Sequence, residues 1–195
     1  LITSYDAITR AVIEAAPKLK LIACTRANPV NVDTAAAKER GIPVLFTPGR
    51  NSDSVAEMVF WYIISCARHA CYAYKCMHDG QFLAPSDKVT ANRQIGGNAA
   101  DVMWGIDAGS PYTVFKGIDI KGKTLGIIGF GSIGRRVAKI AHAFGMNVLL
   151  YDPFVSEVDV DEIGQTKVDL PTLLKNSDFV SVHLKVTAET KGLMG

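Results

Sequence analysis

The residues of this chain whose types and spacing best suit chemistry form a glycine-rich turn at 129–134, with the sequence Gly-Phe-Gly-Ser-Ile-Gly. The turn follows an apolar run at 124–128, typical of a buried parallel strand, and opens a helical pattern at 135–144. Glycines permit a tight turn and let backbone amides approach a pyrophosphate, while the helix N-terminus supplies partial positive charge. The pattern predicts a dinucleotide-binding unit, with a glycine turn of another doubly wound protein, such as a methyltransferase, as the alternative.

An acidic residue stands where such a unit would contact a ribose. A second apolar run at 147–151 stops on Asp152, 18 residues after Gly134. A carboxylate there can accept a hydrogen bond from a ribose 2′-hydroxyl and would repel a 2′-phosphate, and Pro153 rather than a basic residue follows it. The sequence therefore favours NAD over NADP.

The elements before this unit alternate between helix and strand. Apolar spacing predicts helices over 5–16 and 32–40 and strands over 19–24 and 42–46. This alternation is typical of βαβ units around a parallel sheet, which makes the fold class α/β.

A long helix is predicted over 54–74. Ser54 and Glu57 match a capping box, which favours a capping role for Glu57 over a chemical one. The aromatic run at 60–62 is expected to pack between two domains. The expected apolar face consists of Val55, Met58, Val59, Tyr62, Ile63, Cys66, Ala67 and Ala70.

Composition narrows the class of protein. The 195 residues are 48% hydrophobic and carry a net charge of +2, without the basic runs that nucleic acid or anionic membranes attract. We expect no membrane span and no signal peptide, and the missing initiator Met suggests a start inside a longer protein. Cysteine spacing favours free thiols in a reducing cytoplasm over a metal cluster, so no metal ligands are assigned; the cysteines are Cys24, Cys66, Cys71 and Cys76.

A change of composition divides the chain. Residues 79–117 are rich in Gly, Asn, Asp and Ser and are expected to form a crossover with an insertion. Beyond them we expect a helix over 170–174, capped by Asp169, and a strand over 178–183. The predicted organisation is a substrate domain part at 1–78, the crossover at 79–117 and the first half of a dinucleotide-binding domain at 118–195.

Several motifs in order resemble the D-isomer-specific 2-hydroxyacid dehydrogenases, and within them the phosphoglycerate-dehydrogenase-like group. They lie at 26–33, 41–51, 55–57, 121–129 and 183–195, and together span nearly the whole chain. The resemblance implies a flavodoxin-like substrate domain and a Rossmann NAD-binding domain, both incomplete in this chain.

The resemblance also implies site residues. The substrate carboxylate would be held by the backbone of Arg26, Ala27, Asn28, Pro29 and Val30. The cofactor NAD would be bound by Thr47 near the nicotinamide, and by Gly129, Gly131, Ser132, Ile133, Gly134, Asp152, His183 and Leu184. Ala27 or Asn28 stands where the family has a glycine, which weakens the expected substrate grip if positive φ is needed at Ala27.

The implied activity is hydride transfer between NAD and C2 of a phosphoglycerate-like or sugar-acid D-2-hydroxy acid, in a cytoplasmic homodimer. The family's catalytic Arg, Glu and His would lie beyond Gly195, so this chain alone is expected to be inactive, and its histidines are expected to be structural. Two alternatives stay open: an NAD-sensing corepressor on the same fold, and a dehydrogenase of another substrate such as formate.

Overall fold

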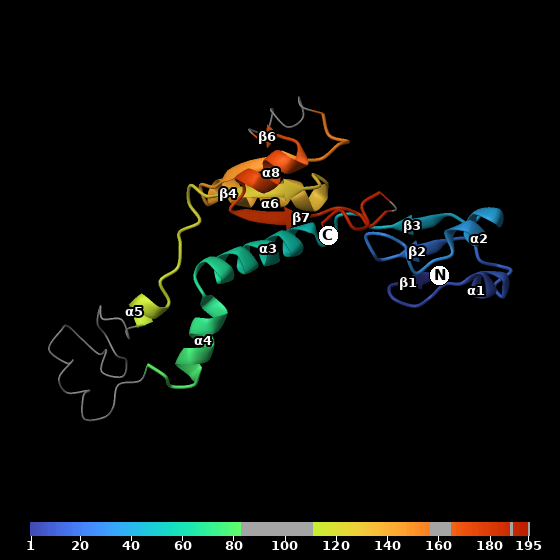
Figure 1. Ribbon diagram of the computed structural model, residues 1–195. Helices are drawn as coiled ribbons and strands as arrows, with labels where there is room; N and C mark the ends of the chain where they lie inside the picture. Colours follow the sequence, from blue (N-terminus) through green and yellow to red (C-terminus); the bar gives the residue numbers. More distant parts are fainter. Residues whose placement is uncertain (83–110, 157–164, 188, 195) are drawn as a thin grey trace. The chain divides into compact units, whose positions relative to one another are not determined.

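A computed structural model describes residues 1–82, 111–156, 165–187 and 189–194. The chain forms two compact units, Leu1–Val55 and Ala56–Gly195. The break at Val55 falls in the first turn of α3 (Ser52–Ala67), well before residue 78, where the predicted substrate segment ends, so most of α3 and all of α4 (Ala70–His78) belong to the second unit (Figure 1). Most of the expected insertion at 79–117 lies outside the described residues.

The first unit is built on a three-stranded parallel sheet in the order β1–β2–β3. Its elements are β1 (Ile2–Thr3), α1 (Arg10–Glu14), β2 (Ile22–Cys24), α2 (Thr34–Glu39) and β3 (Val44–Phe46). The predicted alternation is confirmed, although each element is shorter than expected and the two-residue β1 was not foreseen. Cys24 of β2 pairs with Phe46 of β3, so the segments that follow these strands leave the same edge of the sheet.

Local hydrogen bonds set the helix boundaries of this unit. The helix expected over 5–16 begins only at Arg10, because Ile8 forms a bridge with Val32 and Thr9 caps the helix by accepting from the Val12 amide. Asp33 caps α2 in the same way, accepting from the Ala36 amide at 2.8 Å. The buried core joins both helices to the sheet and comprises Ile8, Ile13, Ile22, Cys24, Val32, Ala36, Ala37 and Ile42.

The prediction of a single long helix over 54–74 is wrong. The structure has α3 (Ser52–Ala67) and α4 (Ala70–His78), separated by His69 in the left-handed conformation at φ 53°. The last carbonyl of α3, that of Ala67, accepts from the Ile118 amide at 2.9 Å, which satisfies the helix end. Because α3 already begins at Ser52, the predicted capping box from Ser54 is also wrong, and Glu57 is exposed in the second turn.

The buried face of α3 also differs from the predicted one. Ala56, Phe60 and Ile63 enter the core of the second unit, while Met58 and Tyr62 are about half exposed, at 47% and 58%. The helix carries apolar residues on several sides, so spacing alone could not identify the face that packs.

The second unit is built on a parallel sheet in the order β6–β5–β4–β7. Its further elements are α5 (Pro111–Val114), β4 (Thr124–Ile128), α6 (Ser132–Ala143), β5 (Asn147–Tyr151), β6 (Thr166–Lys167), α8 (Leu170–Asn176) and β7 (Phe179–Val182). The strands predicted at 124–128, 147–151 and 178–183 are confirmed, and Asp169 caps α8 through the Thr172 amide as expected. The short β6 was missed.

Helices α6 and α8 both pack against the central strands β4 and β5. A Cβ on Gly126 would overlap the Leu173 side chain, so a glycine in β4 lets α8 lie close to the sheet. Val137, Ala138 and Ala141 form the buried stripe of α6. Among the described helices, none combines the length and apolar character needed to cross a membrane.

Candidate dinucleotide site and substrate loop

Gly129 makes the turn that follows β4. Its φ is +95°, its amide donates to the Tyr151 carbonyl at 2.9 Å, and a Cβ there would lie 2.9 Å from the His183 carbonyl. Any larger residue would meet both a strained backbone and the end of the neighbouring strand.

The other two glycines have different roles. Gly131 has an ordinary φ of −76°, and a Cβ added there would meet nothing within 4 Å. A Cβ on Gly134 would instead overlap the Gly129 carbonyl oxygen, so this glycine lets α6 pack closely on the turn. A dinucleotide fingerprint requires one glycine that makes the turn, one that leaves room for the pyrophosphate and one that lets the helix pack closely. Gly129, Gly131 and Gly134 fill these three roles, so the predicted residues fit the cofactor, and we call the open space over Gly131 the pyrophosphate cradle.

The helix behind this turn starts earlier than predicted. It begins at Ser132 rather than at 135, with Gly131 as its N-cap, so Ser132 and Ile133 lie in its first turn. That turn contains no acidic residue, so its partial positive charge is not offset locally. An anionic group over Gly131 would face this helix end.

Asp152 is buried, at 9% exposure, where β5 ends. Its Oδ2 accepts from the Phe130 amide at 2.7 Å, and its Oδ1 accepts from the Phe154 amide at 2.8 Å. Each carboxylate oxygen has a second lone pair, so a ribose hydroxyl can still donate to it. The sequence pattern indicated the ribose contact of Asp152. It did not indicate that the same carboxylate also connects the glycine turn, through the Phe130 amide, with the segment after β5, through the Phe154 amide.

A cavity of about 450 Å³ lies at the carboxyl ends of the sheet strands. It brings together predicted residues from three separate segments: Gly129, Gly131, Asp152, His183 and Leu184. Ligands of open α/β sheets bind at this edge, where the strand order reverses on either side of β4. Sequence reasoning missed several lining residues, including Phe130, Phe154 and Val155, for which the turn and strand patterns carry no signal.

His183 lines this cavity and directly follows β7. Its amide donates to the Ile128 carbonyl at 2.7 Å, and its ring Nε2 lies 2.8 Å from the Ser181 hydroxyl oxygen. Partial burial lowers the pKa of the His183 imidazole, which favours the neutral ring.

In the first unit, Thr47 fastens the segment after β2. Its hydroxyl donates to the Thr25 carbonyl at 3.0 Å, and its amide donates to the Arg26 carbonyl at 3.0 Å. The geometry therefore makes Thr47 a support of the predicted substrate loop, and its contact with a nicotinamide stays a prediction.

The predicted substrate loop borders a cavity of about 320 Å³. Among the described residues only His69 combines a side chain with positive φ, so the loop closes without the strain expected at Ala27. Pro29 is not in the lining and accepts from the Val32 amide at 3.0 Å. The lining consists of the predicted Arg26, Ala27, Asn28 and Val30 with three residues that sequence reasoning missed, Tyr5, Arg50 and Asn51.

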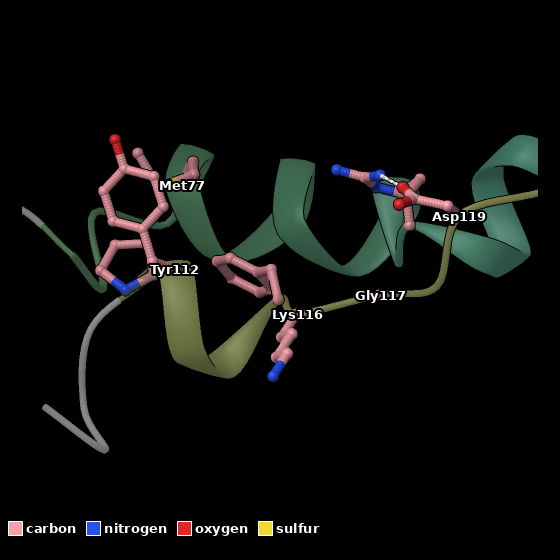
Figure 2. Close-up of a pocket in the computed structure, with 8 residues that line it drawn as sticks. Met77, Tyr112, Lys116, Gly117 and Asp119 are labelled. Carbon is pink, nitrogen blue, oxygen red and sulfur yellow. Dashed lines mark hydrogen bonds and ion pairs between the residues drawn. The ribbon is translucent and has the colours of Figure 1, made fainter. Parts of the chain in front are cut away.

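Another cavity, of about 570 Å³, lies where the segment 115–119 runs beside α3 and α4 (Figure 2). Tyr112 and Met77 lie at one end, and Arg68 donates to Asp119 at 2.8 Å at the other. No predicted site residue lines this cavity, and the guanidinium of Arg68, which does line it, already has the Asp119 carboxylate as its partner.

The cysteines are free thiols, with Cys66 and Cys71 exposed and Cys24 and Cys76 buried. Within the described ranges, no three His, Cys, Asp or Glu side chains gather as a metal site would require.

Comparison with known proteins supports the dinucleotide site. Residues 60–195 match the model of the family described as "D-isomer specific 2-hydroxyacid dehydrogenase, NAD binding domain". Hydroxypyruvate reductase of Thermotoga maritima is 37% identical over 100% of this chain, which covers 53% of that protein. D-3-phosphoglycerate dehydrogenase of Archaeoglobus fulgidus is 35% identical over 100% of this chain, which covers 32% of that protein.

A solved structure extends the similarity to three dimensions. D-lactate dehydrogenase from Aquifex aeolicus, complexed with NAD and lactic acid, superimposes with a TM-score of 0.65 and 30% identity. The match covers 97% of this chain and 49% of that one. The chain thus spans about half the length, or less, of the relatives that it matches.

Proposed function

Because the chain belongs to the D-isomer-specific 2-hydroxyacid dehydrogenase family, we propose that its protein transfers a hydride between NAD and C2 of a D-2-hydroxy acid, phosphoglycerate-like or a sugar acid. Bound NAD would supply the hydride chemistry, and the protein would supply orientation and electrostatics. The observation that carries the proposal is the open cradle at Gly131 beside the α6 N-terminus and the Asp152 carboxylate.

Each group of this cradle has a task in holding the cofactor. The backbone of Ser132 and Ile133 faces the pyrophosphate, and Gly131 leaves room for it. Asp152 accepts from the adenosine ribose while it holds the turn in place. His183 and Leu184 border the same cavity from the end of β7.

The substrate is assigned to the first unit. The backbone amides of Arg26, Ala27 and Asn28 donate to its carboxylate, because Pro29 has no N–H and the Val30 amide donates to the Asn28 carbonyl at 2.9 Å. Thr47 keeps that loop in position through the Thr25 and Arg26 carbonyls. Thr47 is also assigned a contact with the nicotinamide.

The proton of the reaction is assigned to a histidine after Gly195, with a supporting Glu and a carboxylate-orienting Arg. The histidines of this chain have other surroundings. His69 separates two helices, His78 stacks on Tyr74, His142 contacts Gln165 and His183 contacts Ser181.

The test uses the full-length protein with NAD and paired D- and L-2-hydroxy acids, followed by NADH absorbance. We expect NADH to form with at least one D-acid and not with its L-enantiomer. Tight NADH binding without turnover on any acid would instead favour the NAD-sensing corepressor.

The proposal includes a cytoplasmic homodimer. The exposed thiols of Cys66 and Cys71 suit a reducing compartment. Light scattering of the full-length protein during size-exclusion chromatography measures the assembly directly, and a monomeric mass would contradict the dimer.

A further inference from the structure

The two ends of the predicted substrate loop 26–30 are held by different side chains. At its start, the Thr47 hydroxyl donates to the Thr25 carbonyl at 3.0 Å. At its far end lies the half-buried Asn31, which does not line the cavity of about 320 Å³ that the loop borders. Any effect of Asn31 on a ligand in that cavity therefore passes through the loop.

The Asn31 side chain joins its own segment to two strands of the first unit. Its Nδ2 donates to the Asp6 carbonyl at 2.8 Å and to the Thr3 hydroxyl oxygen at 3.3 Å. Its Oδ1 accepts from the Cys24 thiol, with 3.4 Å between sulfur and oxygen. The two donors of the amide and its oxygen thus all have partners, which fixes the side chain in one orientation.

The partners of Asn31 are themselves held by the sheet. Thr3 lies in β1 and Cys24 ends β2, the two are paired in the parallel ladder, and both are buried. The Asn31 backbone is tied to the same region, because its carbonyl accepts from the Ile8 amide at 2.8 Å. The far end of the loop is therefore fixed to the sheet through both side chain and backbone.

The loop between these two ties is short, since only residues 26–30 separate Thr25 from Asn31. A short segment between two fixed ends has few conformations, so a shift of Asn31 moves the amides of Ala27 and Asn28 with it. Hydrogen bonds weaken steeply when donor and acceptor lose their alignment. The grip of these amides on an anion thus depends on where Asn31 holds the chain.

We propose that Asn31 is a positioning residue of the substrate loop: its hydrogen bonds to β1, to the segment after β1 and to the end of β2 hold the amides of 26–28 where a substrate carboxylate accepts from them. The inference rests on the proposed function, which assigns that carboxylate to this loop. In this role Asn31 acts on substrate binding and not on a chemical step, so its loss raises KM and leaves kcat unchanged.

The test compares Asn31→Ala with the wild type in the full-length protein, using whichever of D-lactate, D-glycerate and D-3-phosphoglycerate is oxidised fastest. We expect KM for that acid to rise about tenfold, as weaker contacts with a charged group imply, and kcat to change by less than about twofold. The dissociation constant of NADH, measured by fluorescence titration, should stay the same, because the glycine turn belongs to the other unit. Hydrogen exchange of a peptide containing residues 26–28, followed by mass spectrometry without substrate, should be faster.

Variants of Thr3 test the same hydrogen bonds from the other side and serve if Asn31→Ala fails to fold. Thr3→Val keeps the shape of the side chain but removes the acceptor, so it should also raise KM. Thr3→Ser keeps the hydroxyl and should restore the wild-type KM. The double variant of Asn31→Ala and Thr3→Val should raise KM no further than Asn31→Ala alone, because both remove parts of one network.

Arg40→Gln is the matched control within the same unit. Arg40 donates to the carbonyls of Ala16 and Pro17, which follow α1, and it does not line the cavity. Its loss should lower the melting temperature and leave both KM and the hydrogen exchange of 26–28 at wild-type values.

A KM of Asn31→Ala within about twofold of the wild type, or an equal rise of KM in Arg40→Gln, would overturn the proposal while retaining the dehydrogenase. The absence of NADH formation with every acid in the wild type would instead contradict the proposed function. Hydrogen exchange, which needs no turnover, would then decide about Asn31: faster exchange of 26–28 in Asn31→Ala but not in Arg40→Gln would retain its role in holding the loop, and equal exchange would overturn it.

Discussion

At the scale of single residues, the candidate cofactor site depends on glycines that are not interchangeable. Gly131 faces open space, whereas a side chain on Gly134 would collide with the Gly129 carbonyl inside the fold. The same type of substitution should therefore affect binding at one position and folding at the other.

Gly131→Val should abolish NADH binding and leave the protein folded, because the added side chain fills the pyrophosphate cradle without meeting protein atoms at its Cβ. Gly134→Val should lower the melting temperature strongly, since α6 would have to move away from the turn. Fluorescence titration with NADH and thermal melts measure the two effects. Ser132→Ala, which keeps the backbone, should change affinity modestly; normal NADH binding by Gly131→Val would contradict the cradle.

Asp152 should make the protein prefer NADH to NADPH. Repulsion between its carboxylate and a 2′-phosphate is about 1–3 kcal/mol in a partly buried site. This energy corresponds to a kcat/KM that is roughly 5- to 150-fold higher with NADH than with NADPH. Asp152→Asn should narrow this preference and lower the melting temperature, because an amide nitrogen would face one of two backbone N–H donors. Asp119→Asn, an exposed carboxylate, is the control. Equal efficiencies with the two cofactors in the wild type would disprove the assignment.

His183 should make stability depend on pH. Burial lowers its folded-state pKa below the ordinary 6.5, so the unfolded chain takes up the proton first as the pH falls. The stability that depends on a neutral His183 is therefore fully present above about pH 6.5 and is lost as the pH drops through the folded-state pKa of His183. Between pH 7.5 and pH 5.5, the melting temperature should therefore fall less for His183→Gln than for the wild type. The exposed His78→Gln should behave like the wild type, and an identical loss in all three proteins would refute the effect.

At the scale of elements, α3 shows how a helix that is apolar on several sides selects one face. Phe60 is 4% exposed and stacks on Phe144, with ring centroids 5.3 Å apart. Trp61 and Tyr62, the next two aromatics, are 51% and 58% exposed. Of its three consecutive aromatic residues, α3 therefore packs into the core of the second unit through Phe60 alone.

Phe60→Ala should destabilise the second unit by about 3–5 kcal/mol, because it leaves a cavity in the core. Tyr62→Ala, on the exposed side, should cost much less, about 0.5–1 kcal/mol. Urea unfolding of the full-length protein measures both, with Phe60→Leu as a milder substitute if the alanine variant fails to fold. Equal costs at the two positions would mean that the packed face has been misidentified.

At the scale of the whole molecule, the described part of the second sheet ends in β7 on one side. Val180 and Val182 of this strand are 40% and 46% exposed. An exposed edge with apolar side chains tends to associate with other chains unless something covers it.

The 195-residue chain expressed by itself should therefore aggregate or melt at a lower temperature than the full-length protein. It should also lack dehydrogenase activity, because the proposed base and its partners are placed after Gly195, and positioned acid–base catalysis is worth about 10²–10⁴-fold. NADH oxidation with 2-keto acids, compared between the two proteins, measures this. Turnover within about tenfold of the full-length protein would instead assign catalysis to residues of this chain, with His183 the first to mutate.

The sequence by itself determined those features that depend on near neighbours. The glycine turn, strand β4, Asp152 at the end of β5 and the Asp169 cap all follow from short-range rules of backbone conformation, hydrogen bonding and apolar runs. These rules were enough to predict the α/β class and three residues that line the cofactor cavity, Gly129, Gly131 and Asp152, whereas His183 and Leu184 followed from the family resemblance.

Only the tertiary structure decided features that depend on contacts between distant segments. His69 interrupts the expected long helix where Ile118 bonds to the end of α3, and Phe60 rather than Met58 is buried because Phe144 stacks against it. Arg26 and Arg50 share a cavity because β2 and β3 are parallel neighbours. Sequence spacing cannot determine such pairings, since the energy of packing two segments depends on how both are placed in space.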